Sequence, residues 1–566
     1  MALHHRRYSI LVSIILLVTL IISLSSICIP KEEQTVCFEG PRSLSSKCIG
    51  TIFNNQYYVG FEDVGKYMET VKKARMGTIM LYYNHNFSST QQSLLCSLIY
   101  YCNTNNIDVI LSYNPVPDLH KDSIGTISLE QWKDDIATMV SLFDGKTEHV
   151  LNGVKTTLQV DYFTIMEELD LTKERYGLSY EDLLYLFKTS YDIVKINNPN
   201  AKVLSSLISH YDDSYFKGLL HARLPNGTKY VNTCDILFFD TYGDPEAIIT
   251  ILNKIKSAFA KYQEECLIKP IWNCTGDSRW NHSDEYVSNR IVRHALCSFA
   301  VGADRYINYK LVSYGGNLTS SGYSSYFGLL NPSVDNSYIS FLRNDDSRLP
   351  LSDGIGSEKV YIGYPPIQSK LCPGYVYHEV DSYAMCERLQ QNGLLLICDN
   401  ASISKITISK LNIPTSREIC IYENTDFNSL DRIVIPSYLF NNIKRNDYIK
   451  VYYKNANTSN RIRRVEKTLA YKKLSFLSQI SNGQFDQFIV IKNKGLWIAE
   501  WKDSSSYYYA LWSHTKQNLT IDDKKITTYN SLGDKNSVAN NKGIMVEEDV
   551  IYLVSKQRLL SLINCK

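Results

Sequence analysis

The chain has 566 residues, which is too long for one hydrophobic core and predicts two or three domains. Hydrophobic residues make up 44% of it and charged residues 21%, an ordinary globular composition. The formal net charge is +2, and no stripe of Lys and Arg stands out. Binding to phosphate backbones requires clustered cations, so nucleic acid is not expected as a partner.

The N-terminus predicts the compartment. The basic run His4-His5-Arg6-Arg7 precedes an uncharged apolar segment of 20 residues, 10–29, which ends before Pro30-Lys31. This order fits a secretory signal cleaved around residues 25–28, and the segment is also long enough to anchor a type II membrane protein. Both alternatives place residues 31–566 outside the cytosol, with membrane contact only through the N-terminal segment.

Cysteines and glycosylation motifs agree with that compartment. Thirteen cysteines follow Cys28, with no paired CxxC motifs typical of zinc sites, so disulfides are expected and a metal is not. Cys37 with Cys48, and Cys372, Cys386, Cys398 and Cys420, are the expected participants. Eight N-x-Ser/Thr motifs occur, at Asn86, Asn226, Asn273, Asn281, Asn317, Asn400, Asn457 and Asn518. A chain this rich in Asn, Ser and Thr would contain roughly six by chance, so the count alone supports glycosylation weakly.

Between residues 50 and 343, strand-like and helix-like segments alternate, which is typical of βα units. The expected strands are 51–60, 77–83, 107–113, 160–166, 202–208, 235–240, 267–273 and 305–311. The expected helices are 64–75, 91–102, 129–143, 180–196, 245–262 and 284–300. Eight strands in about 260 residues match the size of one (β/α)₈ TIM barrel.

The pattern changes beyond residue 343. Short runs of β-branched and aromatic residues separated by turn residues predict a C-terminal all-β, sandwich-like domain over 344–566. The expected strands there are 394–398, 405–408, 432–435, 449–453 and 488–491. Trp497 and Trp501 would share one face of a further strand, as a carbohydrate-binding platform or as a domain interface. Residues 31–49 form an N-terminal segment before the expected barrel.

Carboxylates close the fourth expected barrel strand, where Ile165-Met166-Glu167-Glu168-Leu169-Asp170 follows an apolar run. Parallel α/β barrels carry their chemistry at the C-terminal ends of the strands. The motif resembles the strand-four ending of clan A retaining glycoside hydrolases, in which an Asn precedes the acid/base Glu. The resemblance implies that Glu168 is the acid/base and that Glu167 stands where the Asn would hold a sugar hydroxyl.

Three further segments are similar to the same clan, in the same order. Lys269-Pro270-Ile271-Trp272 looks like the strand-seven approach to the nucleophile, and 235–242, ending at Tyr242, looks like strand six. The segments 303–309 and 326–330 look like strand eight and the residues after it. The resemblance covers about residues 50–340 and implies a carbohydrate or glycoconjugate as ligand, with no cofactor and no metal.

One departure from the clan is chemically decisive. The strand-seven Glu is absent, and Cys274 occupies its position. Retaining hydrolysis requires two carboxyl groups about 5 to 5.5 Å apart, and a thiol is a poor substitute for one of them. Asp277 could supply a displaced carboxylate, although capping of a loop or helix is a simpler explanation for it. Asp240 could act as base in an inverting reaction, although a buried, hydrogen-bonded carboxylate is the simpler interpretation.

Aromatic residues near these strand ends complete the expected site. Trp272 and Trp280 could stack on sugar rings, with core packing as the alternative for Trp272. Neighbours on a strand point to opposite sides, so Glu167 is not expected to replace the missing nucleophile. Two functions follow from the sequence: a glycoside hydrolase without the usual strand-seven nucleophile, or a noncatalytic glycan-binding or adhesion protein that retains the barrel.

Overall fold

The protein is described from a computed structural model. The described residues are 35–45, 47–57, 61–120, 127–172, 176–206, 213–262, 269–277, 282–312, 327–334, 338–343, 358–361, 375–380, 383–399, 402–409, 418–423, 432–454, 462–492, 495–521, 526–536, 543–559 and 563–565. The predicted boundary between 343 and 344, the segment 1–30 and Trp280 lie at or within the gaps between these ranges.

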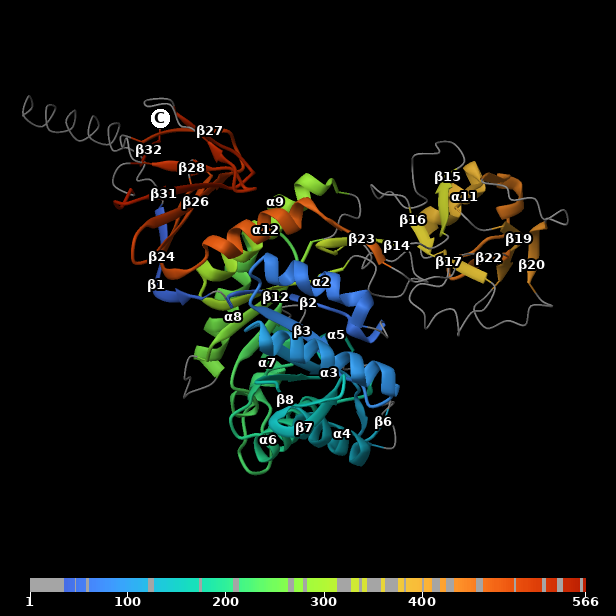
Figure 1. The fold of residues 1–566 in the computed structure, drawn as a ribbon, viewed down its shortest axis with the longest axis horizontal. Coiled ribbons are helices and arrows are strands. Elements are labelled where there is room, and N and C mark those ends of the chain that lie inside the picture. Colours follow the sequence, from blue (N-terminus) through green and yellow to red (C-terminus); the bar gives the residue numbers. More distant parts are fainter. Residues whose placement is uncertain are drawn as a thin grey trace, which may run out of the picture.

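A parallel barrel forms the centre of the molecule (Figure 1). Its strands are β2 (Ile49–Ile52), β3 (Thr78–Tyr82), β4 (Asp108–Tyr113), β9 (Tyr162–Ile165), β10 (Lys202–Leu204), β11 (Leu237–Asp240), β12 (Ile271–Thr275) and β13 (Ala303–Asn308). They pair in the order β10-β9-β4-β3-β2-β13-β12-β11, which is the chain order around a ring. A bridge between Leu204 and Ile236 joins the two ends, so the barrel is nearly closed.

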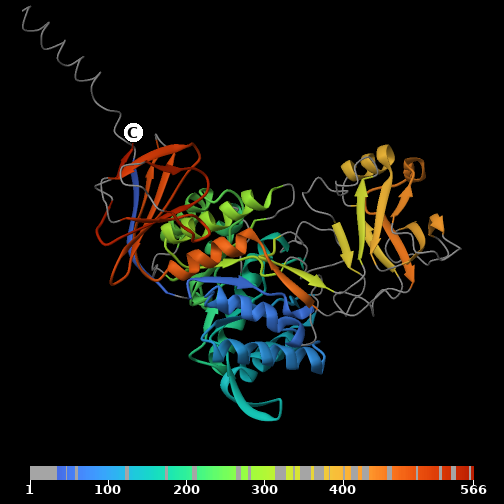
Figure 2. The ribbon, with the colours of Figure 1, turned by 45° about the horizontal axis from the view of Figure 1, so that its top comes forward.

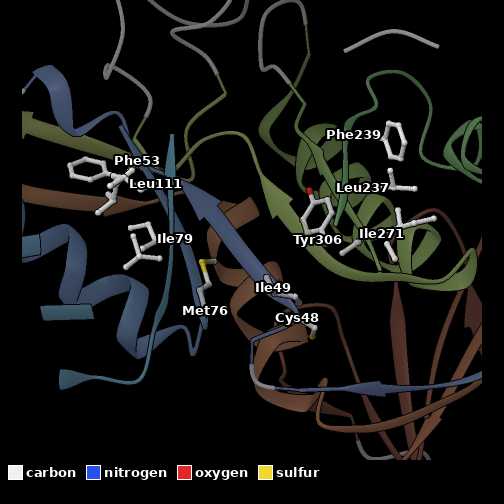
Figure 3. Close-up of a cluster of buried hydrophobic side chains, with 14 of the residues drawn as sticks. Cys48, Ile49, Phe53, Met76, Ile79, Leu111, Leu237, Phe239, Ile271 and Tyr306 are labelled. Atoms are coloured by element: carbon white, nitrogen blue, oxygen red, sulfur yellow. The ribbon is translucent and has the colours of Figure 1, made fainter. Parts of the chain in front are cut away.

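Helices surround this barrel. They are α2 (Phe61–Lys73), α3 (Ser89–Thr104), α4 (Leu129–Leu142), α6 (Tyr180–Asn197), α7 (Asp213–His221), α8 (Ala247–Tyr262) and α9 (Asp284–Ala300). Side chains on the outer faces of the strands pack against them, and Figure 3 shows part of this layer around Ile79, Leu111 and Tyr306. The predicted TIM barrel is confirmed.

Serine side chains start four of these helices. Ser88, Ser128, Ser179 and Ser283 each accept a hydrogen bond from the backbone N–H three residues later. An N-cap of this kind satisfies one of the free donors in the first turn, typically stabilising a helix by about 1 kcal/mol. Four of the predicted helices therefore begin close to a serine that can cap them.

The C-terminal part of the chain forms an antiparallel domain that packs on the barrel. Its main sheet contains β24 (Gly483–Ile491), β25 (Leu496–Lys502), β26 (Tyr507–Ser513), β31 (Ile551–Ser555), β28 (Thr527–Tyr529) and β29 (Lys535–Asn536). The N-terminal strand β1 (Thr35–Leu44) pairs with β24 at its edge. A second sheet of β30 (Ile544–Val546), β27 (Gln517–Ile521) and β32 (Ile563–Cys565) covers one face, with an apolar layer between the sheets. The C-terminal antiparallel sheet domain was predicted correctly.

The other face of the main sheet belongs to the core of the barrel. Helix α12 (Leu469–Ile480) lies along α9, as Figures 1 and 2 show, and its apolar side chains join the same hydrophobic cluster as the barrel helices. Trp501 is fully buried there and donates to the carbonyl of Ile480 at 2.9 Å. Trp497 packs against Phe488 and Trp512. These two tryptophans thus lie in the domain interface.

A separate unit lies to one side of the barrel in both views (Figures 1 and 2). One of its sheets contains β16 (Glu358–Tyr361), β15 (Tyr338–Arg343), β18 (Leu394–Asp399) and β21 (Arg432–Ile435). The other contains β17 (Tyr375–Glu379), β22 (Tyr448–Lys454), β19 (Ser402–Ser409) and β20 (Ile419–Glu423), and helix α11 (Tyr383–Asn392) packs with them. This unit has its own apolar cluster, and the pair β14 (Leu330–Val334) and β23 (Ile462–Lys467) leads into and out of it.

Two further expectations from the sequence concern the disulfides and the apolar segment 10–29. Cys48 and Cys420 form no disulfide in the structure, while Cys372 lies outside the described residues, so disulfide bonding of the remaining cysteines stays a prediction. Burial raises the pKa of Cys48 to about 12. Among the described residues, no helix is long and apolar enough to cross a membrane, and segment 10–29 is outside them.

Burial decides which glycosylation motifs are usable. Asn273 lies in β12 with no exposed surface; its side chain accepts from Thr241 and donates to Ser298, both at 2.9 Å. Asn86, Asn226 and Asn518 are exposed. We expect mass-spectrometric site mapping of protein from a secreting eukaryotic host to find glycans at exposed motifs and none at Asn273. A glycan on Asn273 would contradict the placement of β12.

Candidate functional site

The end of the fourth barrel strand carries two carboxylates in an unusual backbone conformation. β9 ends at Ile165, and Met166 and Glu168 both have positive φ angles, 60° and 53°. Non-glycine residues rarely adopt this left-handed conformation, and such strain concentrates at functional sites. Tyr113 O and Ser206 Oγ fix the backbone of Met166 through hydrogen bonds on its N–H and carbonyl. We expected the side chains of Glu167 and Glu168 to point to opposite faces of a strand. This rule does not apply to them, because both residues lie after the end of β9.

Glu167 is held from two neighbouring strands. Its carboxylate accepts from Ser112 Oγ at 2.6 Å, Asn114 Nδ2 at 3.1 Å and, more loosely, Tyr82 OH at 3.5 Å. Burial raises the pKa of Glu167 to about 7, helped by the charge of Glu168 and opposed by these hydrogen bonds. A carboxyl group with this pKa holds and releases a proton near neutral pH, as acid–base catalysis requires.

Asp240, at the end of β11, is the third carboxyl group of the site. It is 3% exposed, and its Oδ1 atom has no hydrogen-bond partner among the described residues. Burial raises the pKa of Asp240 well above its usual range, and the charge of Glu168 adds to this, while a hydrogen bond from Tyr242 opposes it. Glu167, Glu168 and Asp240, here called the carboxyl cluster, therefore interact at the C-terminal end of the barrel.

Cys274 lies beside the carboxyl cluster. It pairs with Asp240 in the register of β12 and β11, and its side chain is fully buried in the barrel interior. Burial raises the pKa of its thiol well above the usual range, and the charges of Asp240, Glu167 and Glu168 act in the same direction. The thiol is thus neutral and a weak nucleophile. The end of β12, where the resemblance led us to expect a carboxylate, is therefore next to Asp240.

Asp277 has a different environment. Its carboxylate forms an ion pair with the Arg290 guanidinium and lies 3.7 Å from His294 Nε2. Burial would raise the pKa of Asp277, but His294 and Arg290 outweigh it and lower the pKa. Arg290 also bonds to Asp244 at 2.6 Å and to the Gly243 carbonyl at 2.7 Å. Arg290 therefore connects the loop of Asp277 and the loop of Gly243 and Asp244 to α9.

The aromatic residues expected to bind sugar are divided by the structure. Trp272 is 3% exposed; the Tyr162 ring lies 4.8 Å from it and the Arg305 guanidinium 4.1 Å. Arg305 bonds to Asp108 at the start of β4, so Trp272 belongs to the interior below the mouth, consistent with the core-packing alternative. Tyr242 does contact the carboxyl cluster, through Asp240. Trp280 lies outside the described residues.

Sequence reasoning missed the residues that hold Glu167. Ser112 and Asn114 flank the end of β4 in the segment Ser112-Tyr113-Asn114-Pro115. Polar side chains at the end of an apolar strand, followed by Pro, were a usable signal for a second strand end at the site. The described residues contain no group of three or more His, Cys, Asp or Glu side chains arranged to hold a metal ion.

Comparison with known proteins gives matches in structure alone. No family model and no curated protein matches the chain. An endoxylanase of family GH30 from Clostridium papyrosolvens matches with a TM-score of 0.45 and 7% identity, over 92% of this chain and 98% of that one. A GH39 β-xylosidase from Caulobacter crescentus gives 0.44 and 9%, over 92% and 97%. An α-L-arabinofuranosidase from Thermotoga maritima gives 0.44 and 10%, over 90% and 96%.

Each of these three glycoside hydrolases matches this chain over 90% or more of its length. At these identities and TM-scores the likeness concerns the arrangement of the chain, and it transfers no activity and no residue role.

The raised pKa of Glu167 predicts a pH-dependent stability. The unfolded chain loses this proton near pH 4.5 and the folded protein near 7, so this group's contribution to the free energy of unfolding falls as pH rises through that window. Glu167→Gln removes the effect, so we expect the variant to gain stability over wild type, on the order of 2–3 kcal/mol, between pH 4.5 and 7.5.

Urea unfolding at the two pH values measures this difference. Glu548→Gln, at an exposed carboxylate far from the site in the chain, is the matched control and should keep the wild-type difference between the two pH values. Parallel pH profiles for wild type and Glu167→Gln would contradict the burial argument.

Proposed function

We propose that the C-terminal end of the barrel binds a carbohydrate and hydrolyses a glycosidic bond, with Glu168 as general acid/base. The observation that carries this proposal is the carboxyl cluster, in which strands four and six bring Glu167, Glu168 and Asp240 within electrostatic reach of one another. Structural ion pairs join opposite charges. Three carboxyl groups together have no structural benefit unless a ligand or a proton uses them.

Glycoside hydrolysis needs one carboxyl group that donates a proton and one that has lost it. The cluster retains a proton at neutral pH, because burial and mutual repulsion raise the pKa values of Asp240 and Glu167. Neighbouring carboxyl groups titrate as a unit, so this proton is shared. We assign its delivery to the leaving oxygen to Glu168. The opposite role, activating water or attacking the sugar carbon in place of the absent strand-seven Glu, falls to Asp240 in the form of the cluster in which the shared proton is on Glu168 and Asp240 is ionised.

A noncatalytic glycan-binding or adhesion protein is the second candidate. It is favoured by one observation, the neutral thiol of Cys274 at the end of β12 where the nucleophile would stand. In that case the carboxyl cluster would accept hydrogen bonds from sugar hydroxyls without bond cleavage. Under both functions we propose that the protein acts outside the cytosol, on the basis of the N-terminal apolar segment 10–29.

Substitutions in the cluster distinguish the two candidates. In a screen of aryl glycosides and polysaccharides, Glu168→Gln and Asp240→Asn should each lower kcat roughly 100-fold or more, the range expected for loss of an acid or base. Cys274→Ala is the matched control, because it removes the buried thiol next to Asp240 and leaves all three carboxyl groups in place. Its kcat should stay within about threefold of wild type.

The product's anomeric configuration, followed by NMR, then reports whether Asp240 activates water or attacks the sugar. Glycan binding without turnover, equal in wild type and Glu168→Gln, would establish the noncatalytic function. A loss of turnover in Cys274→Ala as large as in Asp240→Asn would contradict the assignment of Asp240.

A further inference from the structure

Lys310 is a buried cation that the proposed chemistry does not use. It follows β13, the eighth barrel strand, at the end of the barrel that carries the carboxyl cluster. The residue is 1% exposed, and its Nζ atom has neither a hydrogen-bond partner nor a carboxylate within ion-pair distance among the described residues. Burying an unpaired ammonium costs several kcal/mol, so such a group in a folded protein calls for a function.

Hydrogen bonds fix the backbone at Lys310, so this residue does not belong to a loosely held loop. Its carbonyl accepts from the N–H of Leu329 at 3.0 Å and from Asn308 Nδ2 at 3.4 Å. The next residue, Leu311, donates to the carbonyl of Ile52 in β2 at 2.8 Å. The ammonium lies 5.7 Å from the centre of the Tyr309 ring, which offers it a weak cation–π contact and no charge.

An aromatic wall connects Lys310 with the carboxyl cluster. Tyr309 packs edge to face on Phe327 with ring centres 5.3 Å apart, and Phe327 packs in the same way on Tyr242 at 6.0 Å. Tyr242 donates a hydrogen bond to Asp240. Gly276 permits this close packing, because a Cβ there would lie 2.0 Å from the Tyr309 carbonyl oxygen and 3.0 Å from Phe327. Phe327 is buried and supports the two tyrosines, and the partly exposed rings of Tyr242 and Tyr309 offer the apolar surface that the C–H face of a sugar ring could contact.

The two ends of this wall carry complementary unsatisfied groups. Within the described part of the chain, Asp240 Oδ1 has no hydrogen-bond partner at one end and Lys310 Nζ has none at the other. Burial lowers the pKa of Lys310 to about 8, so most of the side chain is still protonated at pH 7. A ligand along the aromatic wall would satisfy both groups, by placing a hydroxyl or glycosidic oxygen at Asp240 and a negatively charged hydrogen-bond acceptor at Lys310.

We propose that the barrel binds an acidic glycan, whose carboxylate or sulfate group is recognised by Lys310. This inference rests on the proposed carbohydrate function and adds to it the class of substrate. The carboxyl cluster repels an anionic substituent, and Lys310 attracts it, so the pair fixes the direction in which the sugar lies along the aromatic wall. Lys310 is thus a specificity residue and has no part in the proton transfer.

Matched glycans test this recognition. Three probes are chondroitin oligosaccharides: an unsulfated one that carries only carboxylates, a carboxyl-reduced sulfated one that carries only sulfates, and a carboxyl-reduced unsulfated one that is neutral. Two more are the charged glucuronide and the neutral glucoside of methylumbelliferone. Calorimetric titration of wild type should show an affinity for at least one charged probe that is roughly tenfold or more above that for its neutral partner, as a charged hydrogen bond provides. The carboxylate and sulfate probes separate the two sources of negative charge.

Lys310→Met keeps the length and removes the charge, and we expect it to lose this preference while its affinity for neutral probes stays unchanged. Thermal unfolding of the variant checks its folding, and removal of an unpaired buried charge should leave it at least as stable as wild type. Lys155→Met, at an exposed lysine, is the matched control and should keep the preference. An unchanged preference in Lys310→Met, or equal binding of charged and neutral probes by wild type, would overturn the inference and leave the proposed function intact. Failure of every charged and neutral glycan to bind would overturn both.

Discussion

Helix α9 is enclosed on all sides, and the arrangement of the molecule depends on this. Every residue from Val287 to Phe299 is buried, because the barrel covers one face of the helix and α12 with the C-terminal sheet covers the other. Buried polar groups of such a helix are stabilised where they have partners. Arg290 has such a partner in Asp277, and Lys473 of α12 bonds to Asn289 and, at 2.7 Å, to Asp549. These contacts join the barrel and the C-terminal sheet into one core.

Closure of the barrel brings distant residues to one site. Parallel strands in chain order around a ring direct all their C-terminal ends to the same mouth, which is why Glu168 and Asp240 meet across 72 residues. The interior below is filled by apolar side chains such as Met80, Ile110 and Phe238. This dry layer beneath the carboxyl cluster removes water from one side of it, and desolvation is the largest cause of the raised pKa values of Glu167 and Asp240.

Much of the barrel was predictable because its signals are local. Apolar runs mark the strands, amphipathic spacing marks the helices, and capping serines place several helix starts. The hairpin β7 (Asp144–Leu151) and β8 (Val154–Gln159) was missed, although Asn152-Gly153 carries the two positive φ angles of a tight hairpin turn and was visible in the sequence. Membership of β1 in the C-terminal sheet could not be predicted, since it depends on pairing with residues more than 400 positions away.

The site was less predictable, because its geometry depends on where regular structure stops. Period-two alternation applied to Glu167 and Glu168 gave opposite sides, whereas β9 ends two residues earlier. Trp272 was expected at the mouth from its place near a strand end, but depth along the barrel depends on strand register, which a single sequence does not contain. Asp277 resembled a displaced nucleophile by spacing alone, and its partner Arg290 belongs to a different element.

Cys274 acquires a physical meaning once the neighbouring charges are known. A glutamate at this fully buried position would add a fourth carboxyl group next to Glu167, Glu168 and Asp240. Each added carboxylate raises the pKa values of the others, so the cluster would bind a further proton or destabilise the fold. A neutral thiol avoids this repulsion, and it allows Asp240, one strand away, to lie inside the barrel. The thiol at the end of strand seven and the carboxylate at the end of strand six are therefore two parts of one electrostatic arrangement.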